Sequence, residues 1–280
     1  MVEERDQGDH QAAGSQIPEA LDGEKKWTGK AMDKTKDAGE KGPRTRIDPA
    51  GEETRPAYWR TRILPVEEEI LRRNKIVSRF PEEAMTDQIN LLRTQVLHRM
   101  ERLGGNTLLV ASANHGEGRT FTCLNLAISI SHELNQTVLL VDADLRRPSV
   151  NRLLGLESRK GLSDYLLGTA EIPDLLLNPG MDKCVVLPAG RPLPNSAELL
   201  GSQRMNALVR EMKDRYPDRF ILFDGPPLLA CADSLVISRI LDGVLLVTEA
   251  EKTPAKDLLR AMDLLKDRPV IGAVLNKARA

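Results

Sequence analysis

Short apolar segments alternate with longer stretches of helical periodicity beyond residue 105 of this sequence. In the stretches after Thr120, Ser202 and Pro254, apolar positions recur at the spacing of one helix face. Between these stretches, near-continuous apolar runs are typical of strands that are buried on both faces of a parallel sheet. Alternation of the two patterns predicts an α/β fold, a doubly wound and mostly parallel sheet with crossover helices on both faces. The predicted strands are residues 107–113, 137–143, 184–190, 220–226, 243–250 and 269–276.

A further amphipathic helix is predicted at residues 82–103, immediately before the first strand. Its apolar positions include Ile89, Leu92, Val96 and Met100, which follow helical spacing. This helix leads into the domain.

The first sixty residues carry too few apolar side chains to form a core. Only four of them are Val, Ile, Leu or Phe (Val2, Ile17, Leu21 and Ile47), which is insufficient to offset the entropy of chain ordering. The sequence therefore predicts a charged, disordered arm at residues 1–80 and a folded domain at residues 81–280. Such an arm is either a solvated tail or a docking segment that acts through Trp27 or Tyr58.

Composition narrows the class of protein. The net charge of −1 and the pI near 6.5 give no sign of the basic surface that nucleic-acid binding requires. Cys123, Cys184 and Cys231 are widely spaced in apolar runs, which is typical of reduced, buried thiols in a cytosolic protein. No apolar run approaches the length of a membrane span. We expect a soluble, cytoplasmic protein that neither binds nucleic acid nor inserts into a membrane.

The candidate chemistry centres on ANHGEGRT, residues 113–120, between a predicted strand and a predicted helix. Small residues let backbone N–H groups close around phosphate oxygens, and the helix N-terminus adds a partial positive charge. This is the context of a P-loop, in which Thr120 would place its hydroxyl on Mg²⁺. The alternative is a tight turn without a ligand.

Two positions depart from the P-loop pattern GxxxxGK[ST]. Ala113 replaces the first glycine, which is a mild change. Arg119 replaces the lysine that reaches the β- and γ-phosphates. A guanidinium keeps the charge but is planar and bulkier than an ammonium group, so binding is expected to survive better than turnover.

Acidic residues end two other predicted strands. Asp142 and Asp144 follow the run VLLV, and Asp224 follows FILF. Ligands bind at the carboxyl ends of strands in such sheets, and Asp224 is placed to hold Mg²⁺ as a Walker B aspartate does. Each acid alone is also compatible with a helix cap or a turn. Arg146 and Arg147 either neutralise phosphate or lie on a solvated surface.

Several ordered motifs resemble the bacterial tyrosine kinase family of capsule and exopolysaccharide systems, especially the autokinases of exosortase-associated loci. They are SANHGEGRTFTCLNLA, VLLVDADLRRPSVNRLLGL, GLSDYLLG, PNSAELLGSQRM and FILFDGPPLLACADS, and the resemblance covers residues 84–280. The family has the deviant Walker type of P-loop NTPase fold. Related partitioning ATPases carry an additional lysine early in the P-loop, where this sequence has Asn114.

The resemblance implies ATP and Mg²⁺ as cofactors and assigns roles by position. Arg119, Asp142 and Asp144 would be catalytic, one of the two acids activating the phenol, and Thr120, Asp142 and Asp224 would surround the metal. Asn276 stands where relatives contact adenine, although a turn is an equal alternative. The full set of implied nucleotide contacts is Ala113, Asn114, His115, Gly116, Glu117, Gly118, Arg119, Thr120, Phe121 and Asn276.

The family's function would be tyrosine phosphorylation tied to polymer chain length and export, with a membrane-embedded co-polymerase as partner that recruits the protein to the inner face of the membrane. Relatives phosphorylate a tyrosine-rich tail, which is missing here; Tyr58 is the candidate acceptor. Their ring-forming helix carries Glu-x-x-Arg-x-x-Arg. Here Asp87 and Arg93 preserve only an acid and the last arginine, so the sequence leaves open whether the protein forms a homo-oligomer. The alternatives to a kinase are a nucleotide-gated scaffold of the same export system and a partitioning ATPase.

Overall fold

The computed structural model describes residues 46–47, 53–54, 61–215 and 218–278. The predictions for Trp27 and Tyr58 lie outside these residues. Within residues 46–54, β1 (Arg46–Ile47) and β2 (Glu53–Thr54) pair antiparallel.

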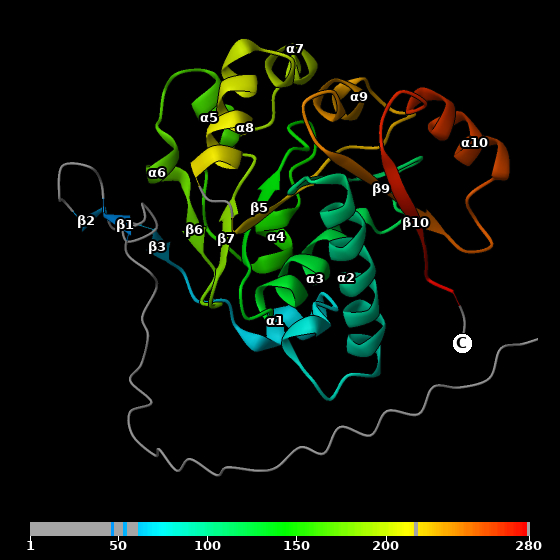
Figure 1. Ribbon diagram of the computed structural model, residues 1–280, viewed down its shortest axis with the longest axis horizontal. Helices are drawn as coiled ribbons and strands as arrows, with labels where there is room; N and C mark the ends of the chain where they lie inside the picture. The colour runs from blue at the N-terminus through cyan, green and yellow to red at the C-terminus, as the bar shows by residue number, and fades with distance from the viewer. Residues whose placement is uncertain (1–45, 48–52, 55–60, 216–217, 279–280) are drawn as a thin grey trace, which may run out of the picture. The chain divides into compact units, whose positions relative to one another are not determined.

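An eight-stranded sheet forms the centre of the domain (Figure 1). All adjacent strands run parallel except β6 and β7, which are antiparallel. The order across the sheet is β10 (Val270–Asn276), β9 (Gly243–Glu249), β4 (Thr107–Ser112), β8 (Arg219–Asp224), β5 (Thr137–Asp142), β7 (Cys184–Leu187), β6 (Leu177–Asn178) and β3 (Arg62–Ile63). All six predicted strands are present, and the predicted doubly wound, mostly parallel α/β fold is confirmed.

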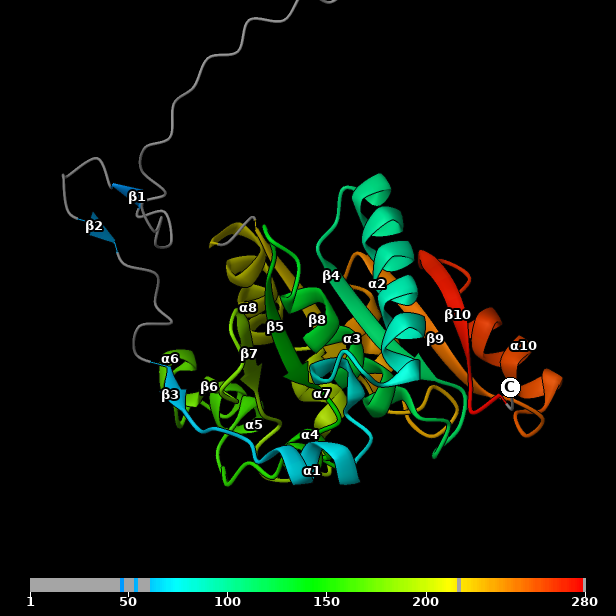
Figure 2. The same ribbon diagram turned by 90° about the horizontal axis from the view of Figure 1, so that it is seen from below.

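Helices cover both faces of this sheet (Figures 1 and 2). The four predicted helices correspond to α2 (Ala84–Leu103), α3 (Arg119–Ser131), α8 (Gln203–Arg215) and α10 (Ala255–Leu264). Shorter helices lie in the connections: α1 (Glu68–Arg73), the 3₁₀-helix η2 (Val77–Arg79), α4 (Val150–Leu154), α5 (Leu162–Leu166), α6 (Ile172–Leu175), α7 (Ser196–Leu200) and α9 (Asp233–Ser238).

The core has two layers because successive strand side chains point to opposite faces. Leu109 and Leu139 pack in one cluster with residues of α8, including Met205. Their neighbours Leu108 and Leu140 pack in the other cluster with residues of α2 and α3. Both faces of the central strands are therefore apolar, which explains their continuous hydrophobic runs.

The folded domain begins before residue 81, where the sequence placed the boundary. Leu71, Ile76 and Phe80 are 1%, 0% and 5% exposed and belong to the core under α3. The side-chain oxygen of Asn125 in α3 accepts hydrogen bonds from the backbone nitrogens of Val77 and Ser78, at 2.8 and 3.0 Å. Because charged residues surround these apolar residues, the sequence pattern did not identify them as part of the core. Residues 1–45, 48–52 and 55–60 of the predicted arm lie outside the described residues.

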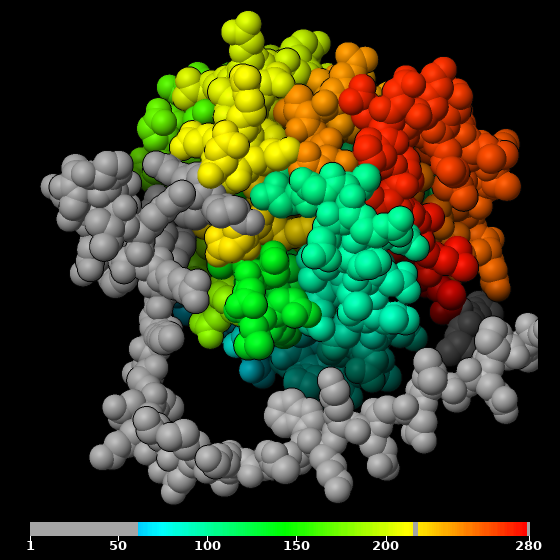
Figure 3. All heavy atoms as spheres, in the orientation of Figure 1, coloured from blue at the N-terminus to red at the C-terminus, as the bar shows by residue number. Residues whose placement is uncertain are grey.

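Side chains of α2 lie beside the edge strand β10 on the surface shown in Figure 3. Arg99 of α2 donates to the backbone oxygen of Ile271 in β10. Among the helices of the described residues, none is long and apolar enough to cross a membrane.

Candidate functional site

The predicted P-loop connects the end of β4 to the start of α3, as the sequence pattern requires. Gly116 and Gly118 have φ values of +83° and +93°, a region that side chains with a Cβ adopt at a cost. At Gly118 a second constraint applies, because an added Cβ would lie 1.9 Å from Nδ2 of Asn276. That nitrogen donates to the backbone oxygen of Glu117 at 2.9 Å. Asn276 thus holds the loop at the end of β10.

Glu117 fixes the inside of the loop. Its carboxylate is buried and accepts hydrogen bonds from the backbone nitrogen of Asn114 at 3.0 Å and from the hydroxyl of Thr253 at 2.7 Å. The Asn114 amide donates to Asp257 of α10 at 3.0 Å. Thr253 and Asp257 belong to no motif, so the sequence analysis missed them. They attach the loop to the segment after β9.

Lys277 contacts the outside of the same loop. Its ammonium group lies 2.8 Å from the backbone oxygen of Gly116 and 3.0 Å from a carboxylate oxygen of Glu249. The loop after β9, the start of α10 and the end of β10 therefore hold the P-loop from both sides. A loop fixed in this way keeps its backbone N–H groups oriented without a ligand, which lowers the ordering cost of phosphate binding.

The predicted acidic residues meet at the carboxyl ends of adjacent strands. Asp142 of β5 lies directly opposite Asp224 of β8 in the parallel register. The hydroxyl of Thr120, in the first turn of α3, donates to Oδ2 of Asp224 at 2.7 Å and lies 3.2 Å from the hydroxyl of Ser149. Strand register and the helix start thus bring the three predicted metal ligands together.

Asp142 is held by backbone donors. Its Oδ2 accepts from the nitrogens of Ser149 and Val150, each at 3.1 Å, and its Oδ1 accepts from the nitrogen of Asp144 at 3.2 Å. Burial, followed by the charge of Asp224, nevertheless raises the pKa of Asp142 to about 8. Burial and the neighbouring Asp224 thus favour the protonated form of this carboxyl group.

Arg119 supplies the cation that these acids require. Its guanidinium hydrogen-bonds Asp144, and its Nε lies 3.5 Å from Oδ1 of Asp224. That last separation makes an ion pair without a hydrogen bond, so both buried atoms lack a hydrogen-bond partner. Burial raises the pKa of Asp224 to about 6, although the Arg119 charge and the Thr120 hydroxyl both act to lower it.

The side chains of this site fit Mg²⁺ better than a metal ion that is coordinated by protein side chains alone. The described residues contain no group of three or more His, Cys, Asp or Glu side chains arranged around an ion. Mg²⁺ commonly takes one or two carboxylates, waters and substrate phosphate oxygens instead. Oδ1 of Asp224, which accepts no hydrogen bond, and the nearby Thr120 hydroxyl offer ligands for such an ion.

The remaining predicted contacts are placed less directly. Ala113 is buried at the end of β4. His115 lies in the loop and is largely exposed; its partial burial lowers its pKa, and the charges of Arg147 and Arg119 add to the effect. Phe121 is half-buried in α3, and its backbone oxygen accepts from Asn125. Nucleotide contacts of these residues stay predictions.

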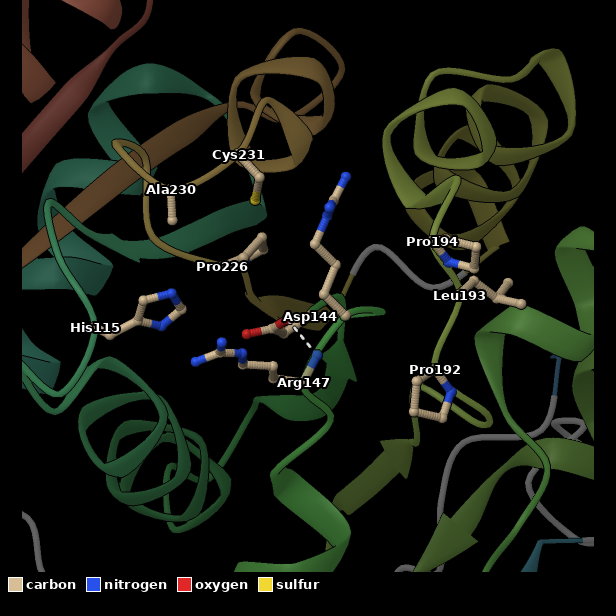
Figure 4. A pocket seen from close by; sticks show the side chains of 10 residues that line it. His115, Asp144, Arg147, Pro192, Leu193, Pro194, Pro226, Ala230 and Cys231 are labelled. Carbon is tan, nitrogen blue, oxygen red and sulfur yellow. Dashed lines mark hydrogen bonds between the residues drawn. The ribbon is translucent and has the colours of Figure 1, made fainter.

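A cavity of about 420 Å³ opens beside the acids (Figure 4). His115 of the P-loop and Asp144 line one side, and the segment from Pro192 to Pro194 lines the other. Cys231 also lines it and is only half-buried, whereas Cys123 and Cys184 are buried as predicted. Asp144 therefore faces an accessible space.

Known proteins that are similar to this chain are tyrosine-protein kinases. No model of a protein family matches the sequence. The chain is 31% identical over 208 residues to the tyrosine-protein kinase YwqD of Bacillus subtilis, which covers 74% of this chain and 86% of YwqD. It is 32% identical over 198 residues to the tyrosine-protein kinase Etk of Escherichia coli, but spans only 27% of the length of that relative.

Solved structures agree with this relationship. The kinase domain of E. coli Etk superposes with a TM-score of 0.68 at 28% identity, covering 78% of this chain and 91% of that domain. The cell division ATPase MinD of Pyrococcus furiosus gives a TM-score of 0.52 at 26% identity, covering 61% of this chain and 71% of MinD.

The fold and its P-loop thus define a P-loop NTPase. Within that class, the chain belongs to the family of bacterial tyrosine-protein kinases. The family, the fold and the enzyme class predicted from the sequence, a protein-tyrosine kinase and hence a phosphotransferase, are confirmed at this level. The cell division ATPase MinD shares the fold but superposes less closely than the Etk kinase domain.

Proposed function

We propose that this chain is an ATP- and Mg²⁺-dependent protein-tyrosine kinase of a polysaccharide export system, where it regulates polymer chain length. One observation supports this most strongly: a phosphate-binding loop, its cation and three acids meet at the carboxyl ends of β4, β5 and β8. Phosphoryl transfer requires mainly positioning and charge neutralisation, and this arrangement supplies both.

In the proposed reaction, the P-loop N–H groups and Arg119 hold the phosphates of ATP. Thr120, Asp224 and Asp142 are the groups that would hold Mg²⁺, which neutralises charge on the β- and γ-phosphates when bound. The phenol oxygen attacks the γ-phosphorus, and the bond from phosphorus to the bridging oxygen breaks, so ADP leaves with that electron pair. Asp144 faces the cavity and is the better placed of the two acids to take the phenol proton.

The surroundings of the reaction are part of the same proposal. A membrane-embedded co-polymerase would recruit the protein from the cytoplasm to the inner face of the membrane and activate it. The folded domain predicted at residues 81–280, together with the core residues that precede it, would act as the kinase domain, following an N-terminal arm.

A second candidate is a scaffold that binds ATP without transferring phosphate. The engagement of Arg119 by both Asp144 and Asp224 favours it, because a nucleotide must displace the guanidinium from these acids.

One experiment separates the two functions. Purified protein is incubated with γ-labelled ATP and Mg²⁺, with and without the cytoplasmic segment of the partner, beside Asp142→Asn and Arg119→Lys variants. Labelled phosphotyrosine in the wild type that disappears in Asp142→Asn supports the kinase. Bound ATP without phosphotyrosine, and activity only in Arg119→Lys, would establish the scaffold instead.

A further inference from the structure

The cavity beside Asp144 has a fixed apolar wall. Pro192, Leu193 and Pro194 line it opposite the P-loop, and Pro226 closes another side (Figure 4). The backbone nitrogen of Leu193 donates to the backbone oxygen of Leu145 at 2.8 Å, which attaches this wall to the acidic segment. Prolines have few conformations to lose, so the wall can contact an aromatic ring at little entropic cost.

Charges around the cavity are paired, with one exception. Arg119 is the counter-ion of Asp144, and Arg146 lies 3.2 Å from a carboxylate oxygen of the buried Asp233. The backbone nitrogen of Arg147 donates to Asp144 at 2.9 Å, while its side chain extends into the cavity toward His115 (Figure 4). With the residues that the structure describes, the Arg147 guanidinium makes neither an ion pair nor a hydrogen bond, and the residue is exposed.

His115 brings no opposite charge to Arg147, because an imidazole is either neutral or positive; partial burial lowers its pKa, and the charge of Arg147 adds to this effect. The cavity therefore combines an apolar wall, a buried carboxylate at the reaction centre and one unpaired cation. Its volume of about 420 Å³ lies within the range of roughly 300–1,000 Å³ that is usual for ligand pockets.

We infer that this cavity selects acceptor segments in which an acidic residue stands next to the tyrosine. The ring packs against the proline wall, and the neighbouring carboxylate pairs with Arg147 in the planar geometry that guanidinium groups favour. The inference rests on the proposed kinase function and specifies its substrate class.

This selection disfavours the acceptor that the sequence analysis suggested. Tyr58 stands among Arg55, Arg60 and Arg62, so its segment brings positive charge to a positive site. The inference therefore favours an acceptor tyrosine with an acidic neighbour over Tyr58 of the chain's own arm.

The test measures binding separately from phosphorylation. Fluorescent peptides with phenylalanine in place of tyrosine, flanked by Glu, Gln or Lys, and a peptide of residues 52–64 with the same replacement are titrated with the full chain in Mg²⁺ and a non-hydrolysable ATP analogue. We expect the Glu-flanked peptide to bind about fivefold or more tightly than the Gln-flanked one, and the Lys-flanked and 52–64 peptides to bind more weakly still.

Arg147→Glu should reverse the order of the Glu- and Lys-flanked peptides. Arg191→Glu, an equal charge change at an exposed residue outside the cavity lining, should leave the order intact. Equal affinities for all flanking charges, no peptide binding, or an Arg147→Glu variant that loses nucleotide affinity instead would overturn the inference. A preserved preference without phosphorylation of the tyrosine peptides would contradict the kinase function alone.

Discussion

At the scale of single residues, Arg119 distinguishes this site from an ordinary P-loop. A lysine offers one point charge, whereas the guanidinium contacts Asp144 and lies near Asp224 at the same time. Asp144 and Asp224 are at most 1% exposed, so without a bound ion they depend on this cation. The position was predictable from the motif, but the double engagement was not, because it depends on how β5 and β8 align.

Removing this cation should destabilise the nucleotide-free protein. Because Arg119→Ala leaves buried carboxylates uncompensated, we expect the free energy of unfolding in urea to fall by about 3 kcal/mol. Arg119→Lys keeps the charge and should lose less than half as much. An Arg119→Ala variant as stable as the wild type would show that the acids do not need their counter-ion.

The raised pKa of Asp142 predicts how stability depends on pH. Folding raises this pKa from its ordinary 3.8 to about 8, so the folded protein keeps a proton that the unfolded chain releases. The contribution is fully present below about pH 4 and is lost as pH rises toward 8.

In EDTA and without nucleotide, the free energy of unfolding should therefore fall more steeply between pH 6 and 8 in the wild type than in Asp142→Asn. The variant should also be about 1–2 kcal/mol less stable at pH 5, because one backbone donor loses its acceptor. Parallel pH profiles for the two proteins would refute the assignment.

At the scale of elements, the end of β10 positions the P-loop. Asn276 donates to the loop and packs where a Cβ of residue 118 would lie. Gly118→Ala should therefore cost at least about 2 kcal/mol of stability, from backbone strain and this clash together.

Gly116→Ala is the matched control, because its φ is also positive but nothing lies within 4 Å of an added Cβ. It should cost only the strain. The double variant Gly118→Ala, Asn276→Ala should lose less free energy of unfolding in urea than the sum of the losses of the two single variants. Strict additivity would mean that the predicted contact does not exist.

Sequence patterns predicted the longer buried strands but not the shortest strands, for a physical reason. Strands β4, β5, β8 and β9 were evident because both of their faces are buried. The two-residue strands β3 and β6 contain too few positions to show any period. Thr253, Asp257 and Lys277 reach the site from a loop, from the first turn of α10 and from the residue after β10, and their spacing in the sequence carries no information about these tertiary contacts.

At the scale of the whole molecule, the helix that the resemblance linked to ring formation is used inside the domain. Arg93 of α2 pairs with Glu133 at 2.8 Å and donates to the backbone oxygen of Ser129 at 3.0 Å. Asn90, one turn earlier, accepts from the Ser129 hydroxyl at 2.8 Å. These side chains attach α2 to α3 within one chain.

Arg93→Ala should therefore lower the melting temperature by about 2–4 °C, the shift expected for roughly 1 kcal/mol in a domain of this size. Light scattering after size exclusion should find the same molar mass for variant and wild type. Dissociation of a larger wild-type assembly by this substitution would show that Arg93 acts between subunits.

The central claim, transfer of phosphate from Mg²⁺-bound ATP to tyrosine at this P-loop, is tested most directly by stoichiometry. ADP release and phosphotyrosine formation are measured in the same reaction, with an acidic tyrosine peptide as acceptor and Asp224→Asn as the inactive control. The kinase account predicts one phosphotyrosine for each ADP in the wild type and neither product in the variant. ADP released without phosphotyrosine would contradict the account and identify the chain as an ATPase.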